Sequence, residues 1–247
     1  MMNYDVVVAG HICLDITPKF PGKGRLDIGN ILKPGKLLKV GDAVISTGGA
    51  VSNTGIALSK LGCKVSYMSS VGHDEFGDII VEKMARYGSV ECFLRNEQIS
   101  SSYSVILAIP SIDRIILHNS GCNDHFSVKN INWEIVAAAR LFHLGYPPIM
   151  KSLYENDGAE LANILKTVKA MGISTSLDMA LPDPDSEAGL MNWSTWFRNV
   201  LPHVDFFMPS IEEMQLLLDR NQWQKLRALN IDFVDSVPLI SYYDICQ

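Results

Sequence analysis

The sequence predicts an α/β protein with a doubly wound, mainly parallel sheet flanked by helices. Strand-like segments at 141–144, 174–177 and 205–208 alternate with helical segments. Such alternation requires crossover connections, which place helices on the faces of a parallel sheet. Residues 5–9 form a continuous, mostly β-branched run, DVVVA, which is typical of a strand buried on both faces.

Composition limits the class of protein. The 247 residues, 47% hydrophobic and 19% charged, predict one large domain over 1–247. A net charge of −6 argues against nucleic acid or an anionic membrane as a main partner. The cysteines are odd in number and have no C-x-x-C spacing, which favours reduced thiols in a cytoplasmic protein: Cys13, Cys63, Cys92, Cys122 and Cys246. Neither a signal peptide nor a long apolar run is apparent.

A glycine-rich stretch at 47–77 is the most informative part of the chain. Gly48 and Gly49 precede a predicted helix at 50–61, which Gly62 ends, and a predicted strand follows at 63–71. Asn53 lies one turn into the helix, where its amide can donate to and accept from a pair of hydroxyls. Spacing alone favours a turn without a ligand, because neither G-x-G-x-x-G nor a P-loop is present.

The order of these residues resembles a known family. Gly-Gly-x-x-x-Asn, a helix, Leu-Gly, a strand and then Gly-x-Asp-x-Phe-Gly at 72–77 resemble the first signature of the ribokinase-like (PfkB) carbohydrate kinases. The resemblance implies that Asp15, Gly48, Gly49 and Asn53 bind a sugar or nucleoside. Without it, Asp15 would be interpreted as a turn or cap carboxylate. The resemblance also implies ATP and Mg²⁺ as cofactors.

A small β lid is the second implication. Residues 17–46 are rich in glycine, proline and lysine and show no helical period, and short strands are predicted at 37–40 and 43–46. Segments 102–109 and 114–118 flank Pro110-Ser111-Ile112-Asp113, which predicts a hairpin. The resemblance assigns about 17–46 and 102–118 to a lid, and Ser120-Gly121-Cys122-Asn123 is similar to the family's Gly-Ala-Asn after it. Because exposed edge strands are commonly covered by pairing, we expect a homodimer through this lid.

The predicted helices have apolar faces that belong to the core. They are expected at 78–87, 155–171, 193–204 and from 210 onward. Trp193 and Trp196 share one helix and are interpreted as core rather than as a stacking platform. The histidines lack metal-ligand spacing. Ligands of such sheets bind beyond the carboxyl ends of strands, where Asp15, Gly48, Asp178 and Glu213 are predicted to lie.

The sequence departs from the family pattern at two places. Ser210 stands where the family's Pro-Asn-x-x-Glu has asparagine, whereas Glu213 is retained. Ser-x-x-Glu is also a capping box. Both roles are compatible, because Glu213 can cap the helix while it orders a metal-bound water.

The family's Gly-Ala-Gly-Asp turn is the second departure. Its amides stabilise the transferred phosphate and its aspartate is the base, but no glycine follows Gly189 here. Asp232, Asp235 and Asp244 lack that glycine context, so no catalytic residue is assigned. The expectation is a sugar kinase chain that holds the substrate-binding part, lacks its C-terminal nucleotide-binding part and is inactive alone.

Three interpretations therefore remain open. The chain is the N-terminal part of an ATP-dependent sugar or nucleoside kinase. Alternatively, it is a short, non-catalytic remnant of that family that binds a polyol or forms dimers. In the third interpretation it is a binding module unrelated to sugars, and the signature is a coincidence.

Overall fold

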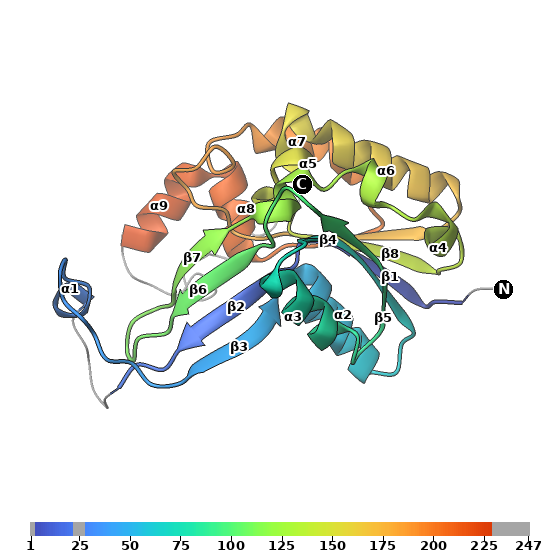
Figure 1. The fold of residues 1–247 in the computed structure, drawn as a ribbon. Coiled ribbons are helices and arrows are strands. Elements are labelled where there is room, and N and C mark those ends of the chain that lie inside the picture. Colours follow the sequence, from blue (N-terminus) through green and yellow to red (C-terminus); the bar gives the residue numbers. More distant parts are fainter. Residues whose placement is uncertain (1–2, 22–27, 229–247) are drawn as a thin grey trace.

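The structure consists of a large sheet between two layers of helices and a smaller sheet that projects from one edge of that core (Figure 1). It is a computed structural model, and it describes residues 3–21 and 28–228. The larger sheet has the order β10-β9-β8-β1-β4-β5, and the smaller has the order β3-β2-β6-β7.

The strands are β1 (Val6–Gly10), β2 (Cys13–Pro18), β3 (Ala43–Gly48), β4 (Val65–Gly72), β5 (Ser89–Asn96), β6 (Tyr103–Leu107), β7 (Ile115–Asn119), β8 (Leu141–Gly145), β9 (Ser174–Asp178) and β10 (Phe206–Met208). The α-helices are α1 (Ile28–Ile31), α2 (Ala50–Lys60), α3 (Glu75–Met84), α4 (Trp133–Ala137), α5 (Lys151–Tyr154), α6 (Ala159–Ala170), α7 (Trp193–Val200), α8 (Ile211–Leu218) and α9 (Arg220–Ala228). Short 3₁₀ helices are η1 (Gly121–His125), η2 (Val128–Asn130), η3 (Pro147–Ile149), η4 (Asn156–Gly158) and η5 (Leu201–His203).

All strand pairs of the six-stranded sheet are parallel, which confirms the predicted fold class. Helices α2 and α3 cover one face, and α4 to α7 cover the other (Figure 1). The apolar run in β1 is continuous because side chains on both faces of this strand are buried in a hydrophobic cluster. Val7 and Ala9 lie in the cluster beneath α4 to α7, whereas Val6 and Val8 lie in the cluster beneath α2 and α3.

The four-stranded sheet, β2, β3, β6 and β7, is the expected lid. β2 pairs antiparallel with β3 and parallel with β6, and β6 and β7 form the predicted hairpin. The chain leaves the core where β1 ends at Gly10. There φ is +112°, and an added Cβ would lie 2.5 Å from the carbonyl oxygen of Gly145.

Several local predictions were wrong. Residues 37–40 are not a strand and belong to neither sheet, and three of the four residues are exposed. Strands β2 and β5 were not predicted, and α1 lies in a segment expected to have no helix. Asp15 therefore does not lie in a turn past a core strand but within β2.

The predicted helix at 155–171 is interrupted. Asn156 and Asp157 have positive φ values of 52° and 53°, so α6 begins only at Ala159. Helix α3 begins earlier than predicted because Asp74 Oδ1 accepts a hydrogen bond from the amide of Gly77 at 2.8 Å. The prediction that Trp193 and Trp196 belong to the core is confirmed, since both are residues of α7 whose side chains are buried in the core. None of the helices in the described part of the chain is long and apolar enough to cross a membrane.

Candidate functional site

The cavity lined by the predicted site residues Asp15 and Gly49, about 820 Å³ in volume, lies between the lid and the core. We call it the lid cavity. Its lid side carries Asp15, Ser104 and His118, and its core side carries Tyr146 after β8 and Leu181 after β9. The cavity therefore opens at the carboxyl ends of parallel strands, where ligands of such sheets bind.

Three polar residues form a row across three lid strands. Asp15 of β2 is in register with Ser104 of β6, and Ser104 is in register with His118 of β7. Because register partners on neighbouring strands share a face of the sheet, all three side chains face the lid cavity. We call Asp15, Ser104 and His118 the inner row, because they occupy the ends of the lid strands nearest the core.

Hydrogen bonds link this row to the core. Ser104 Oγ lies 3.1 Å from His118 Nδ1, and His118 Nε2 lies 3.2 Å from His11 Nε2. The Cys13 thiol donates to Asp15 Oδ1 at 3.3 Å. The carboxylate, the hydroxyl and the imidazoles are thus held in fixed relative positions.

The imidazole of His11 is neutral at neutral pH, and that of His118 is shifted toward its neutral form. Burial, together with a smaller contribution from the neighbouring His118, lowers the pKa of His11 to about 3. Burial also lowers the pKa of His118. Two neutral rings can share one hydrogen between their Nε2 atoms, whereas two protonated rings would repel. His11 Nδ1 is buried without a hydrogen-bond partner in the described structure.

Gly48 and Gly49 let these side chains approach the backbone. A Cβ at Gly48 would lie 2.2 Å from Asp15 Oδ2, and one at Gly49 would lie 2.5 Å from His11 Nδ1. Gly49 also has a φ of +85°, which favours glycine. The structure therefore brings Asp15, Gly48 and Gly49 together, whereas their binding of a ligand stays a prediction.

Asn53 lies slightly apart from that cluster. Its Nδ2 donates to the hydroxyl of Tyr146 at 3.4 Å, so it reaches the lid cavity through that ring. Tyr146 has a left-handed backbone, with φ 71°, and its ring centroid lies 6.0 Å from that of His11. Such a conformation in a bulky residue is costly and often marks a functional position.

Sequence reasoning missed Tyr146, His118, Ser104 and His11 as site residues. The available signal was a tyrosine between Gly145 and Pro147, directly after a buried strand. The inner row had no local signal, because about 90 residues separate Asp15 from Ser104 in the sequence.

Two further carboxylates lie near Tyr146. Asp178 ends β9, and burial raises its pKa to about 6, with a contribution from Glu213. Glu213 makes the predicted capping box: its Oε2 accepts from Ser210 N at 2.6 Å, and its own amide donates to Ser210 Oγ at 3.3 Å. Part of its carboxylate is therefore already occupied by the backbone.

These two residues fit a magnesium ion only as partners of its waters. The described residues contain no group of three or more His, Cys, Asp or Glu that could hold a metal. Mg²⁺ commonly keeps several waters and uses one or two carboxylates together with substrate phosphates. Asp178 and Glu213 would accept hydrogen bonds from those waters. Asp232, Asp235, Asp244 and Cys246 lie outside the described residues.

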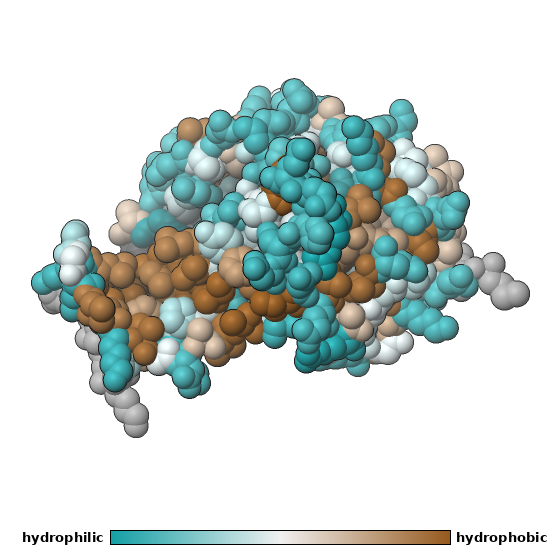
Figure 2. Space-filling model, in the orientation of Figure 1, coloured by the Kyte–Doolittle hydropathy of each residue, from teal (hydrophilic) through white to brown (hydrophobic). Residues whose placement is uncertain are grey.

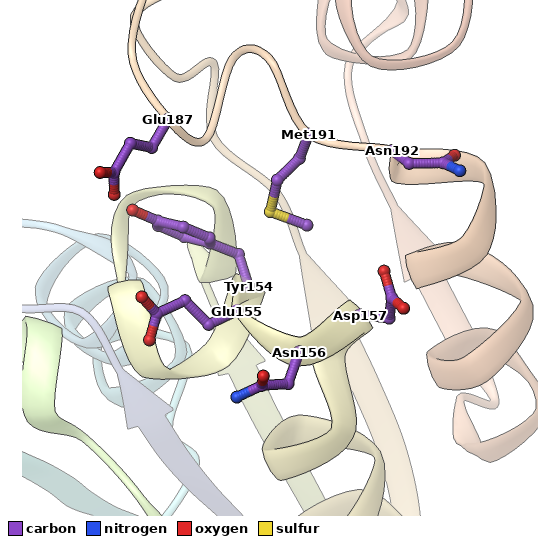
Figure 3. A pocket seen from close by; sticks show the side chains of 7 residues that line it. All are labelled: Tyr154, Glu155, Asn156, Asp157, Glu187, Met191 and Asn192. Carbon is purple, nitrogen blue, oxygen red and sulfur yellow. The ribbon is translucent and has the colours of Figure 1, made fainter.

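A second, smaller cavity of about 300 Å³ lies between α5, η4 and the start of α7 (Figure 3). Its acidic side chains include Glu155 and Glu187. Lys151 Nζ lies 3.3 Å from a Glu155 oxygen and 3.0 Å from a Glu187 oxygen. The lysine balances the two carboxylates, so we interpret this cavity as structural.

Comparisons with known proteins agree with this architecture. Residues 4–234 match the model of the pfkB family carbohydrate kinases. An uncharacterized sugar kinase of Archaeoglobus fulgidus is 25% identical over 158 residues, which are 64% of this chain and 58% of that protein. The chain thus spans less than two thirds of the length of this relative.

Solved structures share the fold at lower identity. A PfkB protein from Polaromonas sp. JS666 has a TM-score of 0.68 at 20% identity, covering 87% of this chain and 68% of that chain. A fructokinase from Xylella fastidiosa has a TM-score of 0.67 at 19% identity, covering 91% and 68%. Arabidopsis thaliana ribokinase complexed with ribose and ATP has a TM-score of 0.64 at 19% identity, covering 92% and 68%.

The family match extends over more than nine tenths of the chain, and the fold is the one these structures share. The chain therefore belongs to the pfkB family of carbohydrate kinases.

Proposed function

We propose that the lid cavity binds the hydroxyl-bearing sugar or nucleoside that receives a phosphoryl group from ATP. The observation that carries this proposal is the position of the Asp15 carboxylate. It lines the cavity and packs so closely against Gly48 that a side chain at position 48 would collide with it. A carboxylate accepts strongly from hydroxyls, and charge-assisted hydrogen bonds are about twice as strong as neutral ones.

ATP and Mg²⁺ are part of the same proposal. Ribose and ATP occupy the Arabidopsis ribokinase structure, and ATP occupies another structure of the Xylella fastidiosa fructokinase. In this chain Asp178 and Glu213 would orient the waters of the metal. A bound Mg²⁺ supplies charge neutralisation of the phosphates.

We further propose that the 247 residues alone do not turn over ATP. No glycine follows Gly189, so residues 190–247 cannot form the family's Gly-Ala-Gly-Asp turn. The residual function would then be binding of a polyol without phosphoryl transfer. An ATP-consumption assay with a sugar and nucleoside panel tests this, and substrate-dependent turnover would contradict it.

Binding is the direct test of the site. Isothermal titration with the same panel should find a ligand for the parent chain, and Asp15→Asn should weaken its binding about tenfold or more. Asp42→Asn is the matched control, because Asp42 is exposed and outside the lid cavity. Equal binding by the Asp15→Asn variant and the parent would refute the site.

The lid also supports a homodimer as a proposal. On the lid face opposite the cavity, Ile45, Ile16, Val105 and Leu117 are register partners across all four strands. We call these residues the apolar row. Figure 2 shows hydrophobic side chains gathered over the lid strands. A second copy of this chain would cover the apolar row and the lid's edge strands.

Cytoplasmic location, expected from the cysteine pattern, stays a prediction.

A further inference from the structure

We infer that the acceptor is a nucleoside, a polyol that carries a planar apolar group, rather than a free sugar. This inference rests on the proposed function of the lid cavity and names its substrate class. It is carried by the division of the cavity into a polar part and an apolar part.

The lid side of the cavity changes character over a single step along the strands. The inner row of Asp15, Ser104 and His118 is polar. Two residues farther from the core on β6 and β7, Ile106 and Ile116 are register partners and also line the cavity. We call this pair the outer row.

The core side has an apolar stretch as well. Pro148 and Ile149 of η3 and Leu181 and Pro182 after β9 line the cavity. A free pentose or hexose carries a hydroxyl on nearly every carbon. In contact with the outer row and these residues, such hydroxyls would lose their waters and gain no hydrogen bond, which is unfavourable.

Charged residues of the lining are mostly engaged by their neighbours. Asp124 Oδ1 accepts from the Lys151 amide at 3.0 Å, and Asp183 Oδ1 accepts from the Asp185 amide at 3.0 Å. Arg227 Nη2 lies 3.1 Å from Glu212 Oε1. These three groups are therefore less available to sugar hydroxyls than the carboxylate of Asp15 in the inner row.

A nucleoside satisfies both parts of the cavity at once. Its ribose hydroxyls would meet Asp15 and the inner row, while its base would lie against Ile106 and Ile116. Burial of the planar base removes apolar surface from water on both sides. The volume of about 820 Å³ accommodates the larger ligand.

The test is isothermal titration of the full 247-residue chain with adenosine, uridine, ribose, fructose and ribose 5-phosphate. At least one nucleoside should bind about tenfold or more tightly than ribose, because pocket contacts of one or a few apolar carbons give that discrimination. Ile116→Ser should reduce nucleoside binding about tenfold and leave ribose binding unchanged.

Val44→Ser is the matched control. Val44 and Ile116 are both β-branched residues of lid strands and are exposed to a similar degree, 50% and 54%, but only Ile116 lines the lid cavity, and Val44 is outside the apolar row. Ile106→Val, which removes one methyl group, is a second variant that preserves the strand and should also lower the preference for the nucleoside.

Different failures separate the two proposals. Ribose or fructose binding as tightly as every nucleoside, with a need for Asp15, overturns the inference and leaves the proposed function standing. Preference for ribose 5-phosphate also overturns it, and would assign the exposed Arg114 at the cavity to the phosphate. If no compound binds in an Asp15-dependent way, the proposed function itself fails.

Discussion

Gly48 is the position where one methyl group would disturb the lid cavity most directly. A Cβ there would lie 2.2 Å from Asp15 Oδ2 and 2.7 Å from its Cγ, so the carboxylate must move. We expect Gly48→Ala to weaken ligand binding about tenfold, since overpacking of this kind costs roughly 1–3 kcal/mol. Isothermal titration measures the effect.

Gly41→Ala is the control for that substitution. The nearest atoms to its added Cβ are 3.4 Å and 3.5 Å away, both in Lys19, and its φ is not positive. It should bind ligand as the parent does. A Gly48→Ala variant with unchanged affinity would show that the position of Asp15 does not matter.

His143 gives a pH dependence of stability that can be isolated. Burial lowers its pKa to about 4, so the folded state keeps it neutral while the unfolded chain, at about 6.5, takes up a proton. Its contribution is fully present above pH 6.5 and is lost as the pH falls toward 4. Between pH 7 and 5 the loss is about 2 kcal/mol.

His143→Gln should remove that part of the dependence. Chemical denaturation at pH 7 and pH 5 should show a smaller decrease in the free energy of unfolding for the variant than for the parent. Asp178 acts in the opposite direction, because its raised pKa of about 6 favours the folded state as the pH falls, but it is common to both proteins. Equal decreases would mean that His143 is protonated in the folded state.

At the scale of elements, the contribution of the N-terminal cap of α8 to stability can be measured. Ser210 Oγ accepts from the Glu213 amide, and Glu213 Oε2 accepts from the Ser210 amide. Ser210→Ala should lower the free energy of unfolding by about 1 kcal/mol, whereas Ser210→Asn, the residue expected from the family, should change it little. Urea unfolding curves compare the three proteins. A neutral Ser210→Ala would mean that the cap contributes nothing.

Sequence reasoning placed the elements better than it placed their ends. The apolar run of β1 and the alternation after 141 were sufficient for the parallel sheet, because burial on both faces leaves a local signal. β2 was missed because half of its residues face the lid cavity and are polar or only partly buried. The break before α6 was missed because it depends on left-handed Asn156 and Asp157, which no period reveals.

The same distinction holds for the site. Gly48 and Gly49 were predicted because they belong to the motif at 48–77, and Asp15 was predicted from the family resemblance alone. Ser104 and His118 were not, because only strand register places them beside Asp15. Local patterns report a residue's own environment, whereas register is a property of the assembled sheet.

At the scale of the whole molecule, the apolar row predicts the oligomeric state. Light scattering at micromolar concentration should give about twice the chain mass of 27.3 kDa. Leu117→Lys should shift the protein toward the mass of one chain, because a buried unpaired charge is costly. Ile116→Lys, on the opposite face, should leave the mass unchanged. A parent chain that is monomeric at these concentrations would refute the dimer.

Because side chains alternate along a strand, the two faces of the lid can change independently during evolution. Neighbouring codons for Ile116 and Leu117 specify side chains on opposite sides of one ribbon only a few ångströms thick. Under the two proposals, a mutation at Ile116 alters ligand preference, whereas a mutation at Leu117 alters the assembly. A lineage could then exchange its substrate without losing the proposed dimer, or change its assembly without losing the proposed binding site. A library that randomises alternate lid positions would sample these two traits one at a time.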